Sequence, residues 1–212
     1  MPSDTPDQRS ALRERLRFLR AFLAHPRRMG ALLPTTRAAV DAMLDLDGVE
    51  DAEVVLELGA GTGSHTRAIL DRMGPSGHLI AVEIDPALAA SVRAELADPR
   101  LEVVTGSAED LHEILDDRVP DVIVSALPFT SLPSEVSARI LDRAAQALPD
   151  HGCLLVLQYS PVVTRSLRRR FARVQRTVSP RNLPPAFLFA CRRSRLANQA
   201  DRAGPAEDDP SP

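Results

Sequence analysis

Between residues 49 and 196 the hydrophobic and polar positions follow two alternating patterns. Short apolar runs rich in β-branched residues predict strands at residues 53–58, 78–84, 101–105, 121–126 and 152–158. The intervening segments, at residues 64–73, 86–97, 109–117 and 134–148, have helical spacing. Regular alternation of strand and helix predicts right-handed crossovers, and therefore a parallel sheet with helices on both faces.

The C-terminal part of this region breaks the alternation. Residues 173–179 and 186–192 both predict strands, and only a short proline-rich segment joins them. A connection of this length suits an antiparallel pair at the end of the sheet. The expected fold class is therefore α/β and Rossmann-like, with a seven-stranded, mostly parallel sheet and an antiparallel strand near the C-terminus.

Residues 9–48, ahead of this domain, predict two helices. Over residues 9–24 the leucines recur at spacings of four, three and four, and arginines lie mostly elsewhere around the helical wheel. Pro26 ends this basic amphipathic helix, and a second helix is expected at residues 35–46. Residues 1–8 and 197–212 lack apolar periodicity and are expected to be disordered, which leaves residues 49–196 as the folded domain.

The composition limits the class of protein. The 212 residues, 44% of them hydrophobic, are enough for one sizeable core. Two cysteines and no Cys/His cluster argue against a disulfide framework and against a metal site. The chain begins with a polar segment instead of a signal sequence, and no apolar run is long enough to span a bilayer. We expect a protein of the reducing cytoplasm.

The charge is distributed unevenly along the chain. Residues 41–150 hold 22 acidic residues against 7 arginines, whereas residues 151–195 hold 10 arginines and no acidic residue, within a net charge of -3. The N-terminal segment is basic as well, so positive charge precedes and follows the acidic residues 41–150. Basic flanks around an acidic middle favour a positive face that meets nucleic acid or a lipid surface. The alternative is a set of solvated surface arginines.

A glycine-rich turn follows the first predicted strand. The segment Glu57-Leu-Gly-Ala-Gly-Thr-Gly63 opens a helix, where backbone amides approach a ligand closely. The glycine spacing differs from that of a dinucleotide-binding turn, and the preceding Glu57 suits a ligand with a positive centre and no phosphate. Glu83 ends the second strand, where its carboxylate can accept hydrogen bonds from both ribose hydroxyls.

With these motifs the chain resembles the class I S-adenosylmethionine-dependent methyltransferases. The resemblance implies S-adenosyl-L-methionine as cofactor, with the glycine turn under its amino acid part, the acid of the second strand on its ribose, and the loop after the third strand around its adenine. Ser107 stands where many members have an aspartate facing the adenine amine. The implied cofactor-binding residues are Glu57, Gly59, Ala60, Gly61, Gly63, Glu83, Ile84, Ser107, Ala108 and Ser125.

The loop after the fourth strand indicates the methyl acceptor. It reads Ser125-Ala-Leu-Pro-Phe129, and adenine N6-methyltransferases usually carry Asn or Asp where Ala126 stands. In those enzymes that side chain accepts a hydrogen bond from the adenine amine and the aromatic residue stacks on the base. Ala126 accepts no hydrogen bond, which disfavours RNA as the substrate, although Phe129 remains available for stacking.

The chain also resembles the soluble bacterial phospholipid N-methyltransferases, which methylate phosphatidylethanolamine. This resemblance rests on residues 18–20 and 30–34, the glycine turn, residues 125–128 with Pro133, residues 158–160 and residues 182–185. The family usually has Gly in place of Ala126 and often Ser in place of Thr35. The resemblance implies transfer of methyl groups to the amine of phosphatidylethanolamine or a similar amphiphile by a peripherally membrane-associated enzyme, with anionic lipids as partners.

The acceptor amine must be neutral, because an ammonium group has no lone pair for the attack. We expect Tyr159, the only tyrosine, to orient the amine or to help remove its proton, with Leu127 and Pro128 beside the reacting groups; His65 and His151 are weaker candidates. The residues expected to meet substrate or membrane are Arg13, Arg17, Phe18, Arg20, Phe22, Phe129, Arg165 and Arg168.

Three other functions stay open from the sequence. They are an RNA adenine dimethyltransferase, a small-molecule natural-product methyltransferase, and an inactive cofactor-binding protein of lipid surfaces.

Overall fold

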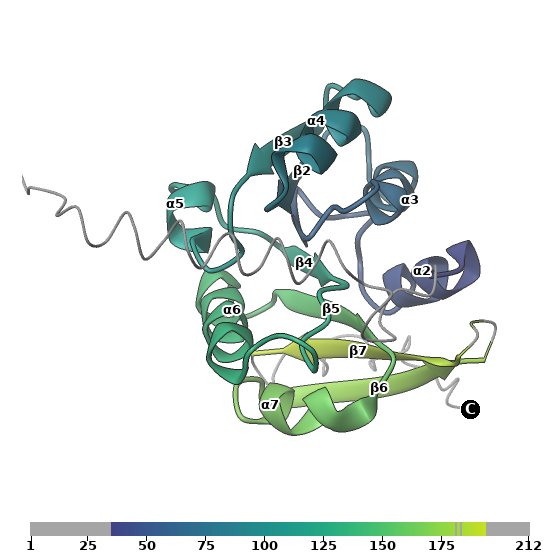
Figure 1. Ribbon diagram of the computed structural model, residues 1–212, viewed down its shortest axis with the longest axis vertical. Helices are drawn as coiled ribbons and strands as arrows, with labels where there is room; N and C mark the ends of the chain where they lie inside the picture. The colour runs from purple at the N-terminus through teal and green to yellow at the C-terminus, as the bar shows by residue number, and fades with distance from the viewer. Residues whose placement is uncertain (1–34, 181, 183, 194–212) are drawn as a thin grey trace, which may run out of the picture.

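The computed structural model describes residues 35–180, 182 and 184–193, and within them helices and strands alternate as the sequence predicts (Figure 1). The expected amphipathic helix at residues 9–24 and both chain ends lie outside the described residues. The elements, in chain order, are α2 (Arg37–Leu44), β1 (Val54–Leu58), α3 (Ser64–Arg72), β2 (His78–Glu83), α4 (Pro86–Glu95), β3 (Leu101–Thr105), α5 (Leu111–Leu115), β4 (Val122–Ser125), α6 (Ser134–Ala147), β5 (Cys153–Gln158), the 3-10 turn η2 (Pro161–Val163), α7 (Thr164–Arg168), β6 (Arg173–Ser179) and β7 (Ala186–Arg192).

The strands form one sheet in the order β3-β2-β1-β4-β5-β7-β6. Neighbouring strands from β3 to β5 are parallel, whereas β7 is antiparallel to both β5 and β6. The predicted fold class, with one strand reversed near the C-terminus, is therefore confirmed. The strand order changes direction between β1 and β4, and ligands of such sheets bind beyond the carboxyl ends of the strands at this point.

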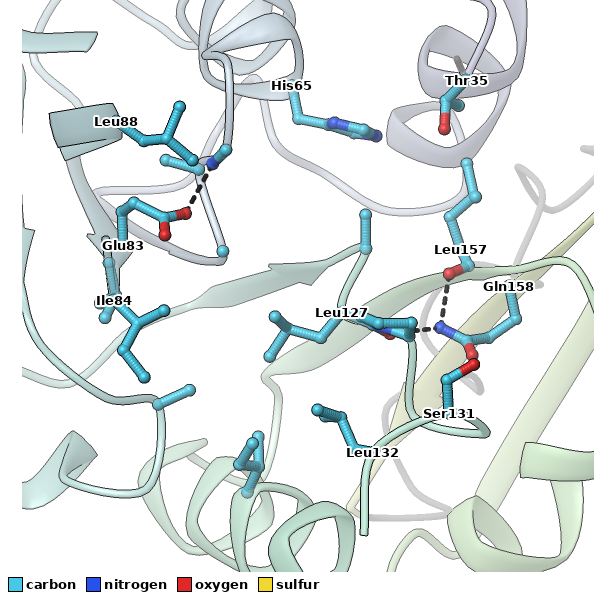
Figure 2. Close-up of a pocket in the computed structure, with 18 of the residues that line it drawn as sticks. Thr35, His65, Glu83, Ile84, Leu88, Leu127, Ser131, Leu132, Leu157 and Gln158 are labelled. Carbon is cyan, nitrogen blue, oxygen red and sulfur yellow. Dashed lines mark hydrogen bonds between the residues drawn. The ribbon is translucent and has the colours of Figure 1, made fainter. Parts of the chain in front are cut away.

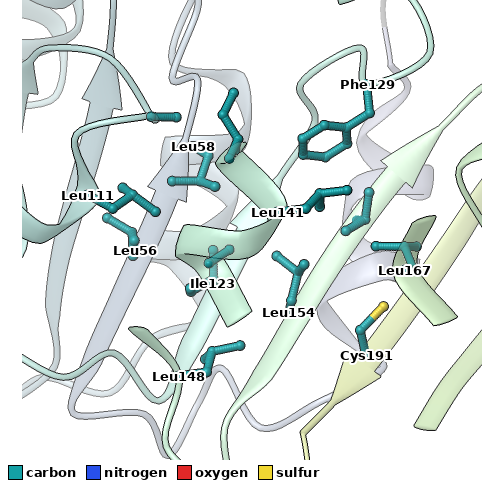
Figure 3. Close-up of a cluster of buried hydrophobic side chains, with 14 of the residues drawn as sticks. Leu56, Leu58, Leu111, Ile123, Phe129, Leu141, Leu148, Leu154, Leu167 and Cys191 are labelled. Carbon is teal, nitrogen blue, oxygen red and sulfur yellow. The ribbon is translucent and has the colours of Figure 1, made fainter. Parts of the chain in front are cut away.

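Alternating side chains of the strands supply apolar clusters on both faces of the sheet, one of them between α4 and the strands β2 and β3. Leu56, Ile123 and Leu154 point to the face covered by α5, α6 and α7 (Figure 3). Val55 and Leu155, each one residue away in its strand, point to the face covered by α2 and α3. Burial of both faces explains why the central strands are almost continuously apolar. It also fixes the register, because a slip of one residue would exchange the faces.

Local capping positions the helices that start at the ligand end of the sheet. The Asp85 carboxylate accepts hydrogen bonds from the amides of Ala87 and Leu88, and Pro86 occupies the first turn of α4.

Two short elements, η2 and α7, follow β5 and were not predicted. They contain only three and five residues, too few for a helical period in the sequence, and they begin where Ser160 and Pro161 cap the turn. Among the described residues, no helix is long and apolar enough to cross a bilayer.

Candidate cofactor and acceptor site

A cavity of about 620 Å³ opens at the carboxyl ends of β1, β2, β4 and β5, where the strand order reverses (Figure 2). A volume of this size accommodates a ligand as large as a nucleoside derivative. One end of the cavity is lined by the loops after β1, β2 and β3, and the other by the loops after β4 and β5 together with Thr35. The first end is the expected cofactor end, and the second is the expected acceptor end.

The glycine turn forms the floor of the cofactor end. Gly59, Gly61 and Gly63 all have positive φ, at 84°, 55° and 79°, which explains why glycines recur here. The amides of Gly59 and Ala60 both donate to the Val82 carbonyl oxygen, so the turn is held against β2. A Cβ atom on Gly59 would lie 2.7 Å from Leu127 Cδ2, so this glycine also lets the acceptor loop approach.

Glu83 projects from the end of β2 beside the turn. Its Oε2 accepts a hydrogen bond from the Gly61 amide at 2.8 Å, and its Oε1 accepts one from the Asp85 amide at 2.8 Å (Figure 2). Each carboxylate oxygen has a second lone pair, so both remain able to accept a hydroxyl from a ligand. The side chain is therefore fixed in position before any ligand arrives, as a ribose-binding carboxylate requires.

Glu57 lies behind the turn and is not part of the cavity wall. Its Oε2 accepts a hydrogen bond from the Thr66 hydroxyl at 2.6 Å, whereas Oε1 is buried without a hydrogen-bond partner in the described structure. Burial raises the pKa of the carboxyl to about 7, the Thr66 hydroxyl lowers it, and the nearby charge of Glu83 raises it further. A buried carboxylate with an unused oxygen favours a cationic ligand group in front of the turn.

The loop after β3 closes the cofactor end. Ser107 and Ala108 line the cavity as predicted, together with Ile84. The Ser107 hydroxyl accepts a hydrogen bond from the Glu109 amide at 3.2 Å, so it shapes the loop. Leu88, the third residue of α4, is 38% exposed and also faces the cavity, which gives a planar base an apolar surface to pack on. The sequence did not single out Leu88, because a helical leucine is ordinarily assigned to a core.

The acceptor loop is held by the side chain of Gln158. Its Nε2 donates to the carbonyl oxygens of Leu127 at 2.7 Å and Leu157 at 2.6 Å, so the amide joins the loop after β4 to the end of β5 (Figure 2). Ala126, Leu127 and Pro128 then face the cavity, as predicted. The backbone amide of Leu127 also donates to the hydroxyl of Ser125, at 3.3 Å.

Two residues of this loop do not lie where the sequence placed them. Phe129 was expected to meet the substrate, but only 5% of it is exposed and it packs in the core beneath α6, so that prediction is wrong (Figure 3). The apolar groups of the wall are instead Leu127, Pro128 and Leu132. Ser125 is fully buried and outside the cavity wall, because β4 continues through it and its hydroxyl is used within the loop.

Polar side chains converge at the acceptor end. The Tyr159 hydroxyl and the Thr35 hydroxyl are 2.8 Å apart, and both residues line the cavity. Asn182 fixes the chain beside Thr35, because its Oδ1 accepts a hydrogen bond from the Thr36 amide and its Nδ2 donates to the Pro184 carbonyl oxygen. The ends of β5, the β6–β7 connection and the start of α2 are thus joined around the cavity.

His65, on the first turn of α3, lines the cavity and points toward Thr35 (Figure 2). Its Nε2 atom is buried and has no hydrogen-bond partner in the described part of the chain. Burial lowers the pKa of the imidazole, which keeps the ring neutral near pH 7. His151 is exposed beside Asp121 and is not part of the wall.

The predicted surface residues are distributed differently. Arg165 and Arg168 are exposed on α7 and do not line the cavity, so their contact with a substrate or membrane stays a prediction. The other predicted residues of this group, Arg13, Arg17, Phe18, Arg20 and Phe22, lie outside the described residues. No group of three or more metal-ligating side chains occurs among residues 35–180, 182 and 184–193.

Comparisons with known proteins agree with this geometry. A family model described as a methyltransferase domain matches residues 55–152. The ornithine lipid N-methyltransferase of Singulisphaera acidiphila is 36% identical over 180 residues, which cover 82% of this chain and 94% of that protein. The ribosomal RNA small subunit methyltransferase A of Thermobifida fusca is 34% identical over 116 residues, 51% of this chain and 37% of that protein.

Among solved structures, the N-methyltransferase NodS of Bradyrhizobium japonicum WM9 in complex with S-adenosyl-L-homocysteine superposes with a TM-score of 0.61. Its sequence is 14% identical, and the match covers 74% of this chain and 85% of that one, so the likeness concerns the fold alone. The fold and site are those of a class I S-adenosylmethionine-dependent methyltransferase, and the chain belongs to this family. Within this family, the match to the ornithine lipid N-methyltransferase extends over nearly the whole length of that protein.

The residues of the cofactor end fit S-adenosylmethionine. The fixed Glu83 carboxylate is available to the ribose hydroxyls, Ile84 and Leu88 offer an apolar surface to the adenine, and the glycine turn leaves room for the amino acid part. The buried Glu57 favours the positive charge that this cofactor carries. The chain is thus an S-adenosylmethionine-dependent methyltransferase.

Proposed function

We propose that the enzyme methylates the primary amine in the headgroup of an aminolipid, with a headgroup like that of ornithine lipids as the first candidate. The observation that carries the proposal is the 36% identity to an ornithine lipid N-methyltransferase across 94% of that relative. The acceptor loop supports it, because Ala126 leaves the wall small and apolar at the place where an adenine-modifying enzyme needs a hydrogen-bond acceptor.

The cofactor supplies a methyl group on a sulfonium, and an amine lone pair displaces it in line. The protein must therefore hold the amine on the axis and keep it unprotonated. In this proposal the Tyr159 hydroxyl, fixed by Thr35, orients the amine at the acceptor end. The neutral His65 ring lies in the same wall, and its Nε2 has no hydrogen-bond partner among the described residues, so the tautomer with its proton on Nδ1 can accept a proton there. Leu127 and Pro128 exclude water from the amine.

The distance between the amine and the anion of the headgroup favours an ornithine-type headgroup over phosphatidylethanolamine. In phosphatidylethanolamine the phosphate lies two carbons from the amine, whereas in ornithine the carboxylate lies four carbons from the side-chain amine, so phosphatidylethanolamine brings its anion deeper into the cavity, where an anion would need a cationic partner. No arginine lines the cavity as far as the structure describes it, and Glu83 is the acidic residue there. Phosphatidylethanolamine is therefore the second candidate, and it requires its phosphate to remain at the mouth of the cavity.

An RNA acceptor has less support. The ribosomal RNA methyltransferase relative matches about half of this chain and 37% of its own length. At the acceptor end, Ala126 offers no side-chain acceptor and Phe129 is buried in the core, so a flipped adenine would have neither the hydrogen bond nor the stacking partner that it needs.

The test is methyl transfer from labelled S-adenosylmethionine to vesicles that contain an ornithine lipid, phosphatidylethanolamine or neither. A lipid with the same headgroup but an N-acetylated amine serves as the matched control, because the amide delocalises the nitrogen lone pair and leaves the rest of the lipid unchanged. The proposal predicts label in the ornithine lipid and none in the blocked lipid. Parallel reactions contain ribosomal RNA or a water-soluble amine; label in either of these with none in the lipid would refute the proposal, and so would cofactor binding without transfer to any lipid.

A further inference from the structure

An exposed apolar residue stands next to the mouth of the cavity. Val162 is 73% exposed, more than the other large hydrophobic residues that the structure describes as exposed, and it lies in η2. Only Pro161 separates it from Ser160, which lines the cavity at its acceptor end. The next residue, Val163, is buried in the core beneath α7, so the turn is anchored while Val162 points into solvent.

A second exposed valine lies at the same corner of the molecule. Val178 of β6 is 45% exposed and pairs with Phe187 of β7, which in turn pairs with Gln158 at the end of β5. Val178 is therefore at the cavity end of the sheet. Because side chains alternate along a strand, it shares a face with Val174, which packs against the same core as Val163. The two exposed valines thus flank one corner, beside the cavity mouth.

Arginines surround this corner. Arg165 and Arg168 are exposed on α7 and Arg169 is exposed at its C-cap, and none of the three forms an ion pair within the described part of the molecule. Arg170, the next residue, forms an ion pair with the Asp142 carboxylate of α6, so that carboxylate is not available to the three exposed arginines. Since residues 151–195 contain no acidic residue, the corner is apolar at its tip and cationic around it.

We propose that the corner formed by η2, α7 and the end of β6 docks on an anionic lipid bilayer, with Val162 and Val178 entering the headgroup layer. An apolar tip with a cationic rim is complementary to such a surface, because the side chains of the tip leave water while the arginines meet anionic headgroups. The orientation turns the acceptor end of the cavity toward the lipid. This inference rests on the proposed function, since only a lipid acceptor requires the mouth to face the membrane.

The test places an environment-sensitive NBD fluorophore on the full chain at Val162→Cys, and in a second sample at Val119→Cys. Val119 is also exposed, at 56%, but it precedes β4 and so lies at the opposite end of the sheet. The native cysteines, Cys153 and Cys191, are buried and their thiol pKa values are raised by burial, so labelling is confined to the introduced sites.

With vesicles of phosphatidylglycerol and phosphatidylcholine we expect NBD emission at position 162 to shift to the blue and to increase at least twofold, while emission at position 119 stays unchanged. Arg165→Gln with Arg168→Gln should weaken binding to these vesicles by about fivefold per arginine, the effect of losing one cation near an anionic surface. The pair Arg67→Gln and Arg143→Gln, exposed arginines of α3 and α6, should weaken it much less.

Unchanged emission at position 162 on vesicle-bound protein would overturn the proposal, and so would tighter binding of the corner to RNA than to vesicles. The probe is read without methyl transfer, so the two proposals fail separately. A blue shift without lipid methylation would leave the docking surface in place and refute the function. Lipid methylation without a blue shift would support the function and refute the docking surface.

Discussion

Replacing Glu57 by glutamine removes a buried negative charge and keeps the size of the side chain. In the folded protein without cofactor the carboxyl has a pKa of about 7, against 4.5 for an unperturbed group, mainly because burial disfavours its charged form. A raised pKa in the folded state means that the folded state binds the proton more tightly. Stability is therefore lost as the pH rises through about 7. At such a pH the carboxyl is ionised in the unfolded chain, so folding must either bury its charge or take up a proton from a solution that holds few.

The size of this loss follows from the difference between the two pKa values. A shift of about 2.5 units corresponds to roughly 3 kcal/mol at pH 8 and to less than about 1 kcal/mol at pH 5. Glutamine loses the charged acceptor of the Thr66 hydroxyl, which takes back about 1 kcal/mol. The net gain for Glu57→Gln at pH 8 is about 2 kcal/mol, or a melting temperature higher by roughly 4–8 °C for a chain of this size.

Thermal unfolding without cofactor, followed by circular dichroism at pH 5 and pH 8, measures the effect. Glu53→Gln, an exposed acid at the start of the same segment, is the matched control and should leave the melting temperature within about 1 °C at both values. The Glu57→Gln variant should be stabilised at pH 8 and close to wild type at pH 5.

The same variant separates a functional carboxylate from a structural one. If Glu57 exists to favour the positive cofactor, isothermal titration should give at least a tenfold weaker affinity for S-adenosylmethionine together with the gain in stability. An unchanged melting temperature at pH 8 would refute the assigned burial effect. A higher melting temperature with unchanged affinity would show that the charge has no part in cofactor binding.

Three further changes test the geometry of the site. Glu83→Gln turns an amide N–H toward a backbone N–H and should weaken S-adenosylmethionine affinity about 100-fold by titration, because hydrogen bonds to a charged group are worth about 1.5–3 kcal/mol each. Gly59→Ala, at φ 84° and with its Cβ 2.7 Å from Leu127 Cδ2, should lower the free energy of unfolding by about 1–2 kcal/mol in urea, whereas Gly48→Ala, with nothing within 4 Å, should change it little. Tyr159→Phe removes the hydroxyl at the acceptor end and should lower kcat about tenfold without changing cofactor affinity, and an equal loss of both would assign Tyr159 a structural part.

The sheet was predictable because burial of both faces leaves a strong trace in the sequence. The central strands are continuous apolar runs such as Cys153–Gln158, and each ends at a turn or a helix cap. The cofactor end was predictable for a related reason. Its residues are contiguous with strand ends, as in the glycine turn after β1 and Glu83 at the end of β2.

The acceptor end was harder to predict, because its contacts join residues far apart in the chain. The hydrogen bond between Thr35 and Tyr159 spans 124 positions, and the one between Thr36 and Asn182 spans 146. Neither pair has a spacing that a local pattern encodes. The direction of Phe129 depends on a loop whose carbonyl oxygen at Leu127 is held by Gln158 from another strand.

We propose that the methyl group goes to a lipid amine. The most direct measurement is a competition, in which the enzyme receives methyl-labelled S-adenosylmethionine, ornithine-lipid vesicles and ribosomal RNA in one reaction, and mass spectrometry locates the label. We expect labelled methyl groups on the nitrogen of the lipid headgroup, fewer of them when Tyr159 is replaced by phenylalanine, and unlabelled RNA. Label on adenine in the RNA, with the lipid unmodified, would contradict it.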